Sequence, residues 1–139
     1  MKKVYKAVIG IVLGLLLAAC GNNVNVSVTG TASKFSREEI ENAAQRVKEK
    51  FEDFRGCELI NLRYDEEKSD SFIKGYLESG RGSVNGVTAE NTIVLLSDFK
   101  VDASGADSGF NPDSTYYDWN WILIRDSEAG EWNVDDWGY

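Results

Sequence analysis

The chain has 139 residues, a formal net charge of −8, two cysteines and no histidine. This length allows one domain, and the acidic charge argues against a nucleic-acid partner and against charge-driven binding to anionic membranes. Without histidine, the serine and cysteine triads built on it and the usual zinc sites are excluded, and we expect no metal ion and no cofactor.

The N-terminal segment has the charge and hydropathy pattern of a bacterial signal peptide. Lys2, Lys3 and Lys6 form a positive region, and the following apolar run spans residues 7–19. A run of about 13 apolar residues suits a signal peptide and is short for a membrane span. We therefore predict a signal peptide over residues 1–19.

Leu17-Ala18-Ala19-Cys20 forms a lipobox at the end of this run. The Cys20 thiolate can take a thioether-linked diacylglycerol, and cleavage between Ala19 and Cys20 frees an amine for a further acyl chain. Each buried CH₂ contributes about 0.8 kcal/mol, so two or three chains make a lasting anchor. This predicts a lipoprotein that is lipid-anchored on the extracytoplasmic face of the cell membrane. The alternative is an ordinary membrane anchor with an incidental cysteine.

Residues 20–35 are predicted to be the lipidated cysteine and a flexible tether, because residues 21–33 are polar and uncharged. Thirteen extended residues reach at most about 45 Å, so the domain stays near the membrane. The alternation of Val24, Val26 and Val28 permits an edge strand instead. With Cys20 acylated, Cys57 has no disulfide partner, and we expect a small buried hydrophobe rather than a reactive thiol.

A long helix is predicted to open the domain, which we place at residues 36–139. Ser36 and Glu39 form a capping box, flanked by Phe35 and Ile40 in the positions of a hydrophobic staple. An apolar stripe follows at helical spacing, and Gly56 marks the stop. The stripe consists of Ile40, Ala43, Ala44, Val47, Phe51 and Phe54.

The rest of the chain alternates in the manner of strands. We predict strands at residues 58–64, 92–102, 116–126 and 131–139, the last two joined by a hairpin turn at 127–130. Residues 65–70 are predicted to be a charged turn, 71–79 a short helix, and 80–91 an irregular segment with at most a weak strand. One long helix followed by mostly antiparallel strands predicts an α+β fold with the helix packed on one face of the sheet.

The C-terminal part carries a family resemblance. Asn111-Pro112-Asp113-Ser114, residues 119–125 (WNWILIR) and the final Trp132-to-Tyr139 segment (WNVDDWGY) resemble bacterial Gram-positive lipoproteins of uncharacterised function. The resemblance implies an NTF2-like (cystatin-like) cone, in which a long N-terminal helix lies across a strongly curved antiparallel sheet. It implies no activity, because this superfold hosts both enzymes and non-catalytic domains.

Aromatic side chains near the C-terminus are candidates for a ligand pocket. The cone has a cavity between its helix and the concave sheet, and we expect some of Trp119, Trp121, Trp137 and Tyr139 to line it. The alternative is plain core packing, because tryptophans bury a large area.

Asp98 and Asp118 are candidates for the same cavity, because each interrupts an otherwise apolar strand. A buried carboxylate with a raised pKa can act as a general base. The alternative is that both face water or cap a loop. The chain has no recognisable paired-acid motif, and we assign no catalytic residue.

Oxygen ligands for calcium gather in one loop, at Asp102, Asp107, Asn111 and Asp113. The spacing does not match an EF-hand and no glutamate closes the loop. A solvated polar turn is the favoured explanation of these residues, so we assign no metal site.

These features favour a non-catalytic surface lipoprotein that binds a small ligand or an envelope protein. One alternative is a structural or immunity-like accessory domain that acts through protein contacts. Another is a small enzyme that uses a carboxylate in the cone cavity. A large exposed aromatic patch beside the C-terminal hairpin would favour a protein partner.

Overall fold

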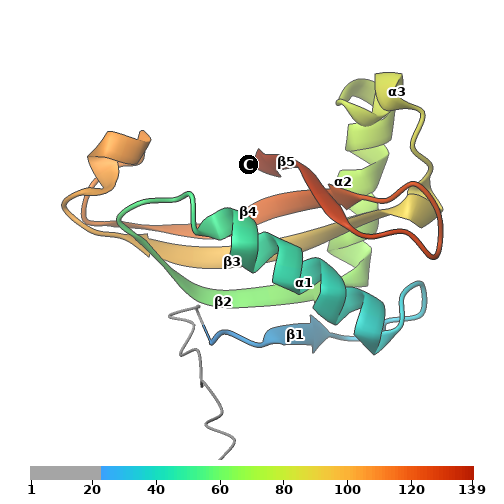
Figure 1. Ribbon diagram of the computed structural model, residues 1–139, viewed down its shortest axis with the longest axis horizontal. Helices are drawn as coiled ribbons and strands as arrows, with labels where there is room; N and C mark the ends of the chain where they lie inside the picture. Colours follow the sequence, from blue (N-terminus) through green and yellow to red (C-terminus); the bar gives the residue numbers. More distant parts are fainter. Residues whose placement is uncertain (1–22) are drawn as a thin grey trace, which may run out of the picture.

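The computed structural model describes residues 23–139 (Figure 1). The predicted lipidation site at Cys20 and the cleavage site between Ala19 and Cys20 lie outside the described residues. Within residues 23–139, no helix has both the length and the apolar character that a membrane crossing requires.

A five-stranded mixed sheet forms the centre of the fold, and the α+β class is confirmed. Its strands lie in the order of the sequence: β1 (Val26–Thr29), β2 (Cys57–Asp65), β3 (Thr92–Val101), β4 (Ser114–Ile124) and β5 (Asn133–Gly138). The four strands from β2 onward are antiparallel neighbours and match the predicted strands closely.

β1 corrects two expectations. It pairs with β2 in parallel, so the sheet is mixed rather than wholly antiparallel. Parallel neighbours need a crossover, and helix α1 provides it between β1 and β2. Residues 26–29 therefore belong to the sheet, in keeping with the alternating valines, and are not part of a free tether.

Helix α1 (Arg37–Phe51) lies across one face of the sheet (Figure 1). Its capping box is confirmed: the Glu39 N–H donates to Ser36 Oγ at 3.2 Å, and the Ser36 N–H donates to Glu39 Oε2 at 2.7 Å. The predicted stripe is buried against β2, β3 and β4. The helix ends at Phe51, so Phe54 packs from the turn that follows rather than from the helix.

Helix α2 (Glu66–Ser79) covers part of the opposite face of the sheet, where Ile73 and Tyr76 pack on Val94 and Ile122 (Figure 1). The predicted charged turn at residues 65–70 is wrong, because Asp65 is the N-cap of this helix and accepts the Lys68 N–H at 3.1 Å. The short helices α3 (Gly82–Asn85) and η1 (Ala89–Asn91) occupy the segment predicted as irregular.

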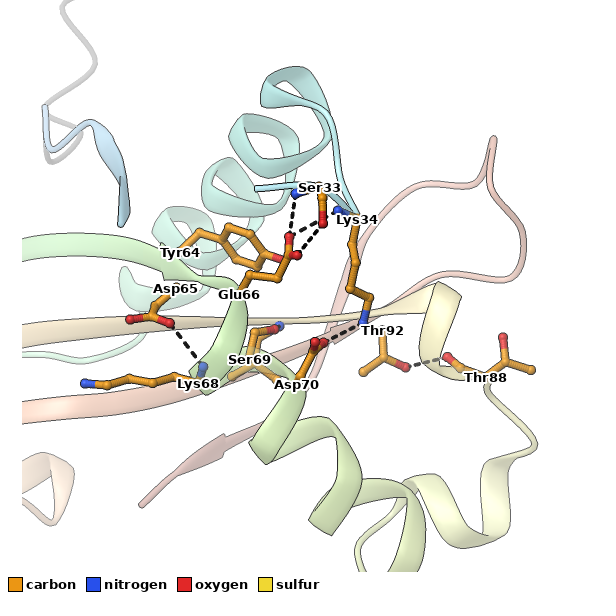
Figure 2. A network of polar contacts seen from close by, with 11 residues as sticks. Ser33, Lys34, Tyr64, Asp65, Glu66, Lys68, Ser69, Asp70, Thr88 and Thr92 are labelled. Carbon is orange, nitrogen blue, oxygen red and sulfur yellow. Dashed lines mark hydrogen bonds and ion pairs between the residues drawn. The ribbon is translucent and has the colours of Figure 1, made fainter. Parts of the chain in front are cut away.

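Glu66 fastens the start of α2 to the chain that enters α1. Its carboxylate accepts the Ser33 N–H at 2.7 Å, the Ser33 hydroxyl at 2.5 Å and the Lys34 N–H at 3.1 Å (Figure 2). Lys34 continues to Asp70, 2.6 Å away. The Ser33 hydroxyl, followed by the two backbone N–H groups, lowers the pKa of Glu66 to about 2.

Candidate functional site: an aromatic groove

A groove of about 520 Å³ opens at one end of the sheet. Its lining comes from the C-terminal end of α1 and the turn after it, the short helix η2 (Gly105–Ser108) with the loop that follows it, and the strands β4 and β5. We call it the aromatic groove. Its lining consists of Lys50, Asp53, Phe54, Arg55, Asp107, Ser108, Phe110, Trp119 and Trp137.

Stacked rings build the apolar part of the aromatic groove. Trp137 is 41% exposed and lies beside the fully buried Trp121, with ring centroids 6.4 Å apart and planes at 30°. Lys50 Nζ lies 4.9 Å from the centre of the Trp137 ring. Phe54 meets Trp119 edge to face, with planes at 88°. The Trp137 indole therefore packs against Trp121 and keeps much of its surface open to solvent.

The four aromatic residues predicted for a pocket are only partly brought together. Trp119 and Trp137 line the aromatic groove. Trp121 is fully buried, and its Nε1 donates to Ser97 Oγ at 2.9 Å, so it belongs to the core. Tyr139 is 76% exposed and packs against Trp119 with ring centroids 5.1 Å apart, outside the groove lining.

Trp119 carries an unsatisfied donor. Its Nε1 is buried and has no hydrogen-bond partner within residues 23–139. Buried N–H groups are nearly always paired, and an unpaired one costs about 1–3 kcal/mol. Because Trp119 forms part of the groove wall, this N–H is a polar group that a ligand oxygen can satisfy if the rings beside it part.

Charges of both signs surround the apolar lining. Lys50 Nζ pairs with Asp53 at 2.9 Å, and Asp107 is exposed on η2. The Arg55 guanidinium makes no ion pair or hydrogen bond with any residue in the described part of the chain. Among residues 23–139, the lining that holds the exposed indole therefore also holds a cation without a partner.

The η2 segment is fixed to the α1–β2 turn by backbone contacts. The Asp102 N–H donates to the Gly56 carbonyl at 2.8 Å, and the Ser108 hydroxyl donates to the Arg55 carbonyl at 3.0 Å. Gly56 has φ of +72°, which favours glycine. These contacts hold Phe110 and Asp107 over the end of α1.

The loop oxygens considered for calcium do not form a site. Among residues 23–139, no three acidic, cysteine or histidine side chains are placed to hold an ion. Asp102 instead stabilises a turn in its own loop, because its Oδ1 accepts the Ser104 N–H at 2.7 Å and the Ser104 hydroxyl at 2.5 Å. The Ser104 hydroxyl and N–H lower the pKa of Asp102.

Asp98 and Asp118 lie away from the aromatic groove. Alternation along β3 puts Asp98 on the face opposite Phe99, which is the face that α2 partly covers. There it joins Asn61, Arg63 and Asp118, which we call the bulge cluster, because the sheet register shifts at Leu59/Asn61 and at Ser97/Phe99.

The bulge cluster keeps the Asp98 carboxylate ionised and compensates its charge with the Arg63 guanidinium. Asp98 accepts the Asp118 N–H at 2.9 Å and the Asn61 amide at 2.7 Å, and Arg63 pairs with both Asp98 and Asp118. Burial alone raises the pKa of Asp98, but these hydrogen bonds and the Arg63 charge outweigh it and lower the pKa. A general base needs a raised pKa, so Asp98 is better described as a structural residue. Its hydrogen bonds join β2 and β4 to β3 where the register shifts.

Arg125 is a buried charge that the sequence reasoning did not single out. Its side chain is 5% exposed, and it donates to Glu39 Oε1 at 2.8 Å, to Asn91 Oδ1 at 3.2 Å and to the Glu90 carbonyl at 3.3 Å. Trp132 stacks on the guanidinium at 4.4 Å. Smaller hollows of about 440 and 320 Å³ flank it. A single arginine at the end of an apolar strand does not indicate, from the sequence alone, that its side chain is buried and joins several segments.

Cys57 is half-buried rather than buried. Burial, followed by the negative charge of Asp102, raises the pKa of the thiol. The raised pKa disfavours the reactive thiolate, as expected for a structural cysteine.

The fold and the groove together define an α+β domain with an aromatic groove at one end of its sheet. The chain belongs to the family described as a domain of unknown function (DUF4829), whose model matches residues 28–138. No curated protein matches the chain, and no solved structure does. The match covers every strand and long helix of the domain apart from the first residues of β1.

Proposed function

We propose that this chain is a lipid-anchored extracytoplasmic domain that binds a small ligand or an envelope partner in the aromatic groove. The observation that carries the proposal is Trp137, whose exposed ring borders a groove of about 520 Å³. Ligand sites commonly occupy about 300–1,000 Å³, and exposed aromatic rings on rigid supports supply much of the energy of recognition.

The anchor is supported by the lipobox at Leu17-Ala18-Ala19-Cys20. Five residues separate Cys20 from Val26, the first residue of β1. Such a segment spans at most about 20 Å, so an acylated Cys20 would hold the domain against the membrane more closely than the predicted thirteen-residue tether.

We also propose that the domain is a variant of the NTF2-like cone. Support comes from α1 lying across the sheet and from three register shifts, at Leu59/Asn61, Ser97/Phe99 and Ile122/Leu123, because bulges bend a sheet. The parallel β1 and the placement of α2 on the second face are departures from the simple cone expected from the resemblance.

The proposal is for binding and not for catalysis. The two carboxylates considered for chemistry are paired with Arg63 on the other face of the sheet. The remaining carboxylates beside the aromatic groove, Asp53 and Asp107, are exposed at its rim.

The indole N–H signals of the four tryptophans test the groove directly. We expect soluble fragments of digested bacterial envelope, added to the ¹⁵N-labelled full chain in detergent, to shift the Trp119 and Trp137 signals. Trp132 packs under Arg125 and outside the groove lining, so its signal should stay in place.

Two variants serve as matched controls for this titration. Trp137→Ala should abolish the shift of Trp119, whereas Tyr117→Ala, which removes a 64% exposed ring outside the groove lining, should leave it intact. Shifts that are absent, or that are equal in the two variants, would contradict binding in the aromatic groove.

A further inference from the structure

We infer that the ligand of the aromatic groove is a neutral saccharide, bound with a sugar ring on Trp137 and its hydroxyl groups at the charged rim. This inference rests on the proposed binding function and names the class of ligand. Three features of the groove and its surroundings carry it: the state of the sheet edges, the pattern of rim charges, and the exposed flat ring.

The sheet edges argue against a peptide that adds as a sixth strand. The Trp137 N–H on edge strand β5 already donates to the Asp136 carboxylate at 2.9 Å. Asp135, at the register shift in β5, accepts the Tyr76 hydroxyl at 2.6 Å and pairs with Arg81. Charges and bulges on an edge strand disfavour pairing with another chain.

The other edge strand is protected in a similar way. The Val26 carbonyl of β1 accepts Arg37 Nη2 at 2.9 Å. A strand added to either edge would therefore have to displace or bypass side chains that already occupy backbone groups. Contact with the aromatic face at the groove has no such cost.

The rim charges favour a neutral ligand. Lys50 and Arg55 would repel a cation, while Asp53 and Asp107 would repel an anion. At longer range the net charge of −8 also opposes the approach of anions. Hydroxyl groups both donate and accept hydrogen bonds, so a polyhydroxylated ligand can pair with all four side chains and with the Ser108 hydroxyl.

The exposed indole matches the shape of a sugar ring. A pyranose presents C–H bonds on its faces and hydroxyl groups around its edge, and C–H groups pack well on the negative face of an aromatic ring. Trp137, 41% exposed and packed against Trp121, offers such a face once Lys50 Nζ, which lies 4.9 Å from the ring centre, moves aside. The Trp119 N–H, which has no partner within residues 23–139, adds a donor that a sugar oxygen can satisfy if the rings beside it part.

Calorimetric titration of the full-length chain with neutral trisaccharides tests the inference. We would use the N-acetylglucosamine trimer and maltotriose, in a zwitterionic detergent that itself carries no sugar headgroup. Saturation-transfer NMR of the sugar protons provides a second readout that needs no tryptophan signal. We expect saturable binding of at least one trisaccharide and transfer to the protons of one ring face.

The variants locate the site. Trp137→Ala should weaken the affinity roughly tenfold or more, as expected for the loss of a stacking anchor. Arg55→Ala should weaken it a few-fold, and because the guanidinium has no partner in the described part of the chain, the fold should be unaffected. Tyr117→Ala should bind as the unaltered chain does.

The outcomes separate the ligand class from the groove itself. If neither trisaccharide binds but a neutral tripeptide of similar size does so in a Trp137-dependent manner, the saccharide is wrong and the groove function stands. If neither class gives a Trp137-dependent signal, the saccharide is wrong, and the proposed function fails with it when the envelope fragments also leave the Trp119 and Trp137 signals unmoved. Saccharide binding that is unchanged in Trp137→Ala would place the sugar elsewhere and overturn the inference.

Discussion

Arg125 shows how a single buried charge can join distant segments. Its guanidinium, at the end of β4, holds Glu39 in the first turn of α1 and the carbonyl of Glu90 in η1, and it stacks on Trp132 of the hairpin. Glu39 also closes the capping box of α1. The hydrogen bond from the Ser36 N–H, followed by that from Arg125, lowers the pKa of Glu39.

Replacing this arginine should therefore be costly. Arg125→Met keeps much of the side-chain volume but leaves the half-buried Glu39, the Asn91 amide oxygen and the Glu90 carbonyl without their donor, which costs about 2 kcal/mol. We expect a loss of this size in the free energy of unfolding measured with urea. Arg46→Met is the control, because Arg46 pairs only with the exposed Glu49 and Glu131, and it should cost no more than about 1 kcal/mol. Equal effects of the two variants would contradict the role of Arg125.

Glu66 gives the fold a dependence on acid pH. Because hydrogen bonds from Ser33 and Lys34 lower its pKa from 4.5 to about 2, the ionised form stabilises the native state. This contribution is complete above the unfolded pKa and is lost as the pH falls through the native value.

Melting temperatures measured from pH 7 to pH 2 check this contribution. We expect Glu66→Gln to melt lower than the unaltered chain at neutral pH and to lose less stability on acidification. Glu67→Gln, which removes the neighbouring charge without touching residues 33–34, should follow the acid profile of the unaltered chain. Parallel acid profiles for the unaltered chain and Glu66→Gln would contradict the stabilising role of the Glu66 hydrogen bonds to residues 33–34.

At the scale of elements, the sequence predicts well where a segment's own pattern decides its structure. The apolar stripe and the capping box of α1 act within one segment, and the strands from β2 onward each span six or more residues. β1 has four residues, and its partner lies beyond the whole of α1, so its pairing is non-local. The acidic start of α2 resembles a turn, although acidic residues also suit the first turn of a helix.

The candidate site was predictable only in part, for the same reason. Strand alternation put Trp119 and Trp121 together but did not show which of them the end of α1 covers. Alternation already puts Asp118 on the face opposite Trp119, but the bulge beside it puts Tyr116 on the face of Trp119 in place of Tyr117, and a bulge of this kind has no clear sequence pattern. Arg55 and Ser108 entered the groove through the packing of η2, which depends on contacts between distant turns.

Gly56 tests how these elements assemble the groove. A Cβ at this position would lie 2.6 Å from Ser104 Oγ and 2.9 Å from the Gly105 nitrogen, so Gly56→Ala should push η2 away. Gly86 has a similar φ of +76° but open space around it. Gly86→Ala should cost about 1 kcal/mol from backbone strain alone, and Gly56→Ala clearly more.

Urea unfolding gives the two costs, and the indole spectrum reports the groove. Gly56→Ala should move the Trp119 signal, because Phe110 beyond η2 packs on Trp119 with ring centroids 5.7 Å apart. Equal stability losses in the two glycine variants, with an unmoved Trp119 signal, would refute the packing argument.

At the scale of the whole molecule, the proposed anchor and the proposed groove constrain each other. A domain held within about 20 Å of the membrane can meet only envelope components, exported proteins and imported solutes. A neutral saccharide of the envelope satisfies both this location and the charge pattern of the groove rim. The protected sheet edges leave the aromatic groove as the surface best suited to contact.

The most direct test measures how fast Trp137 is oxidised by a pulse of hydroxyl radicals, with mass spectrometry as the readout. The rate on intact cells is compared with the rate in the purified full chain. We predict that Trp137 reacts several-fold more slowly on cells, where the groove is occupied, while Tyr117 reacts equally in both settings. In a chain that lacks residues 1–20, and so carries neither the apolar segment nor Cys20, Trp137 should react as fast as in the purified protein. Equal oxidation of Trp137 on cells and in the purified chain would contradict the account.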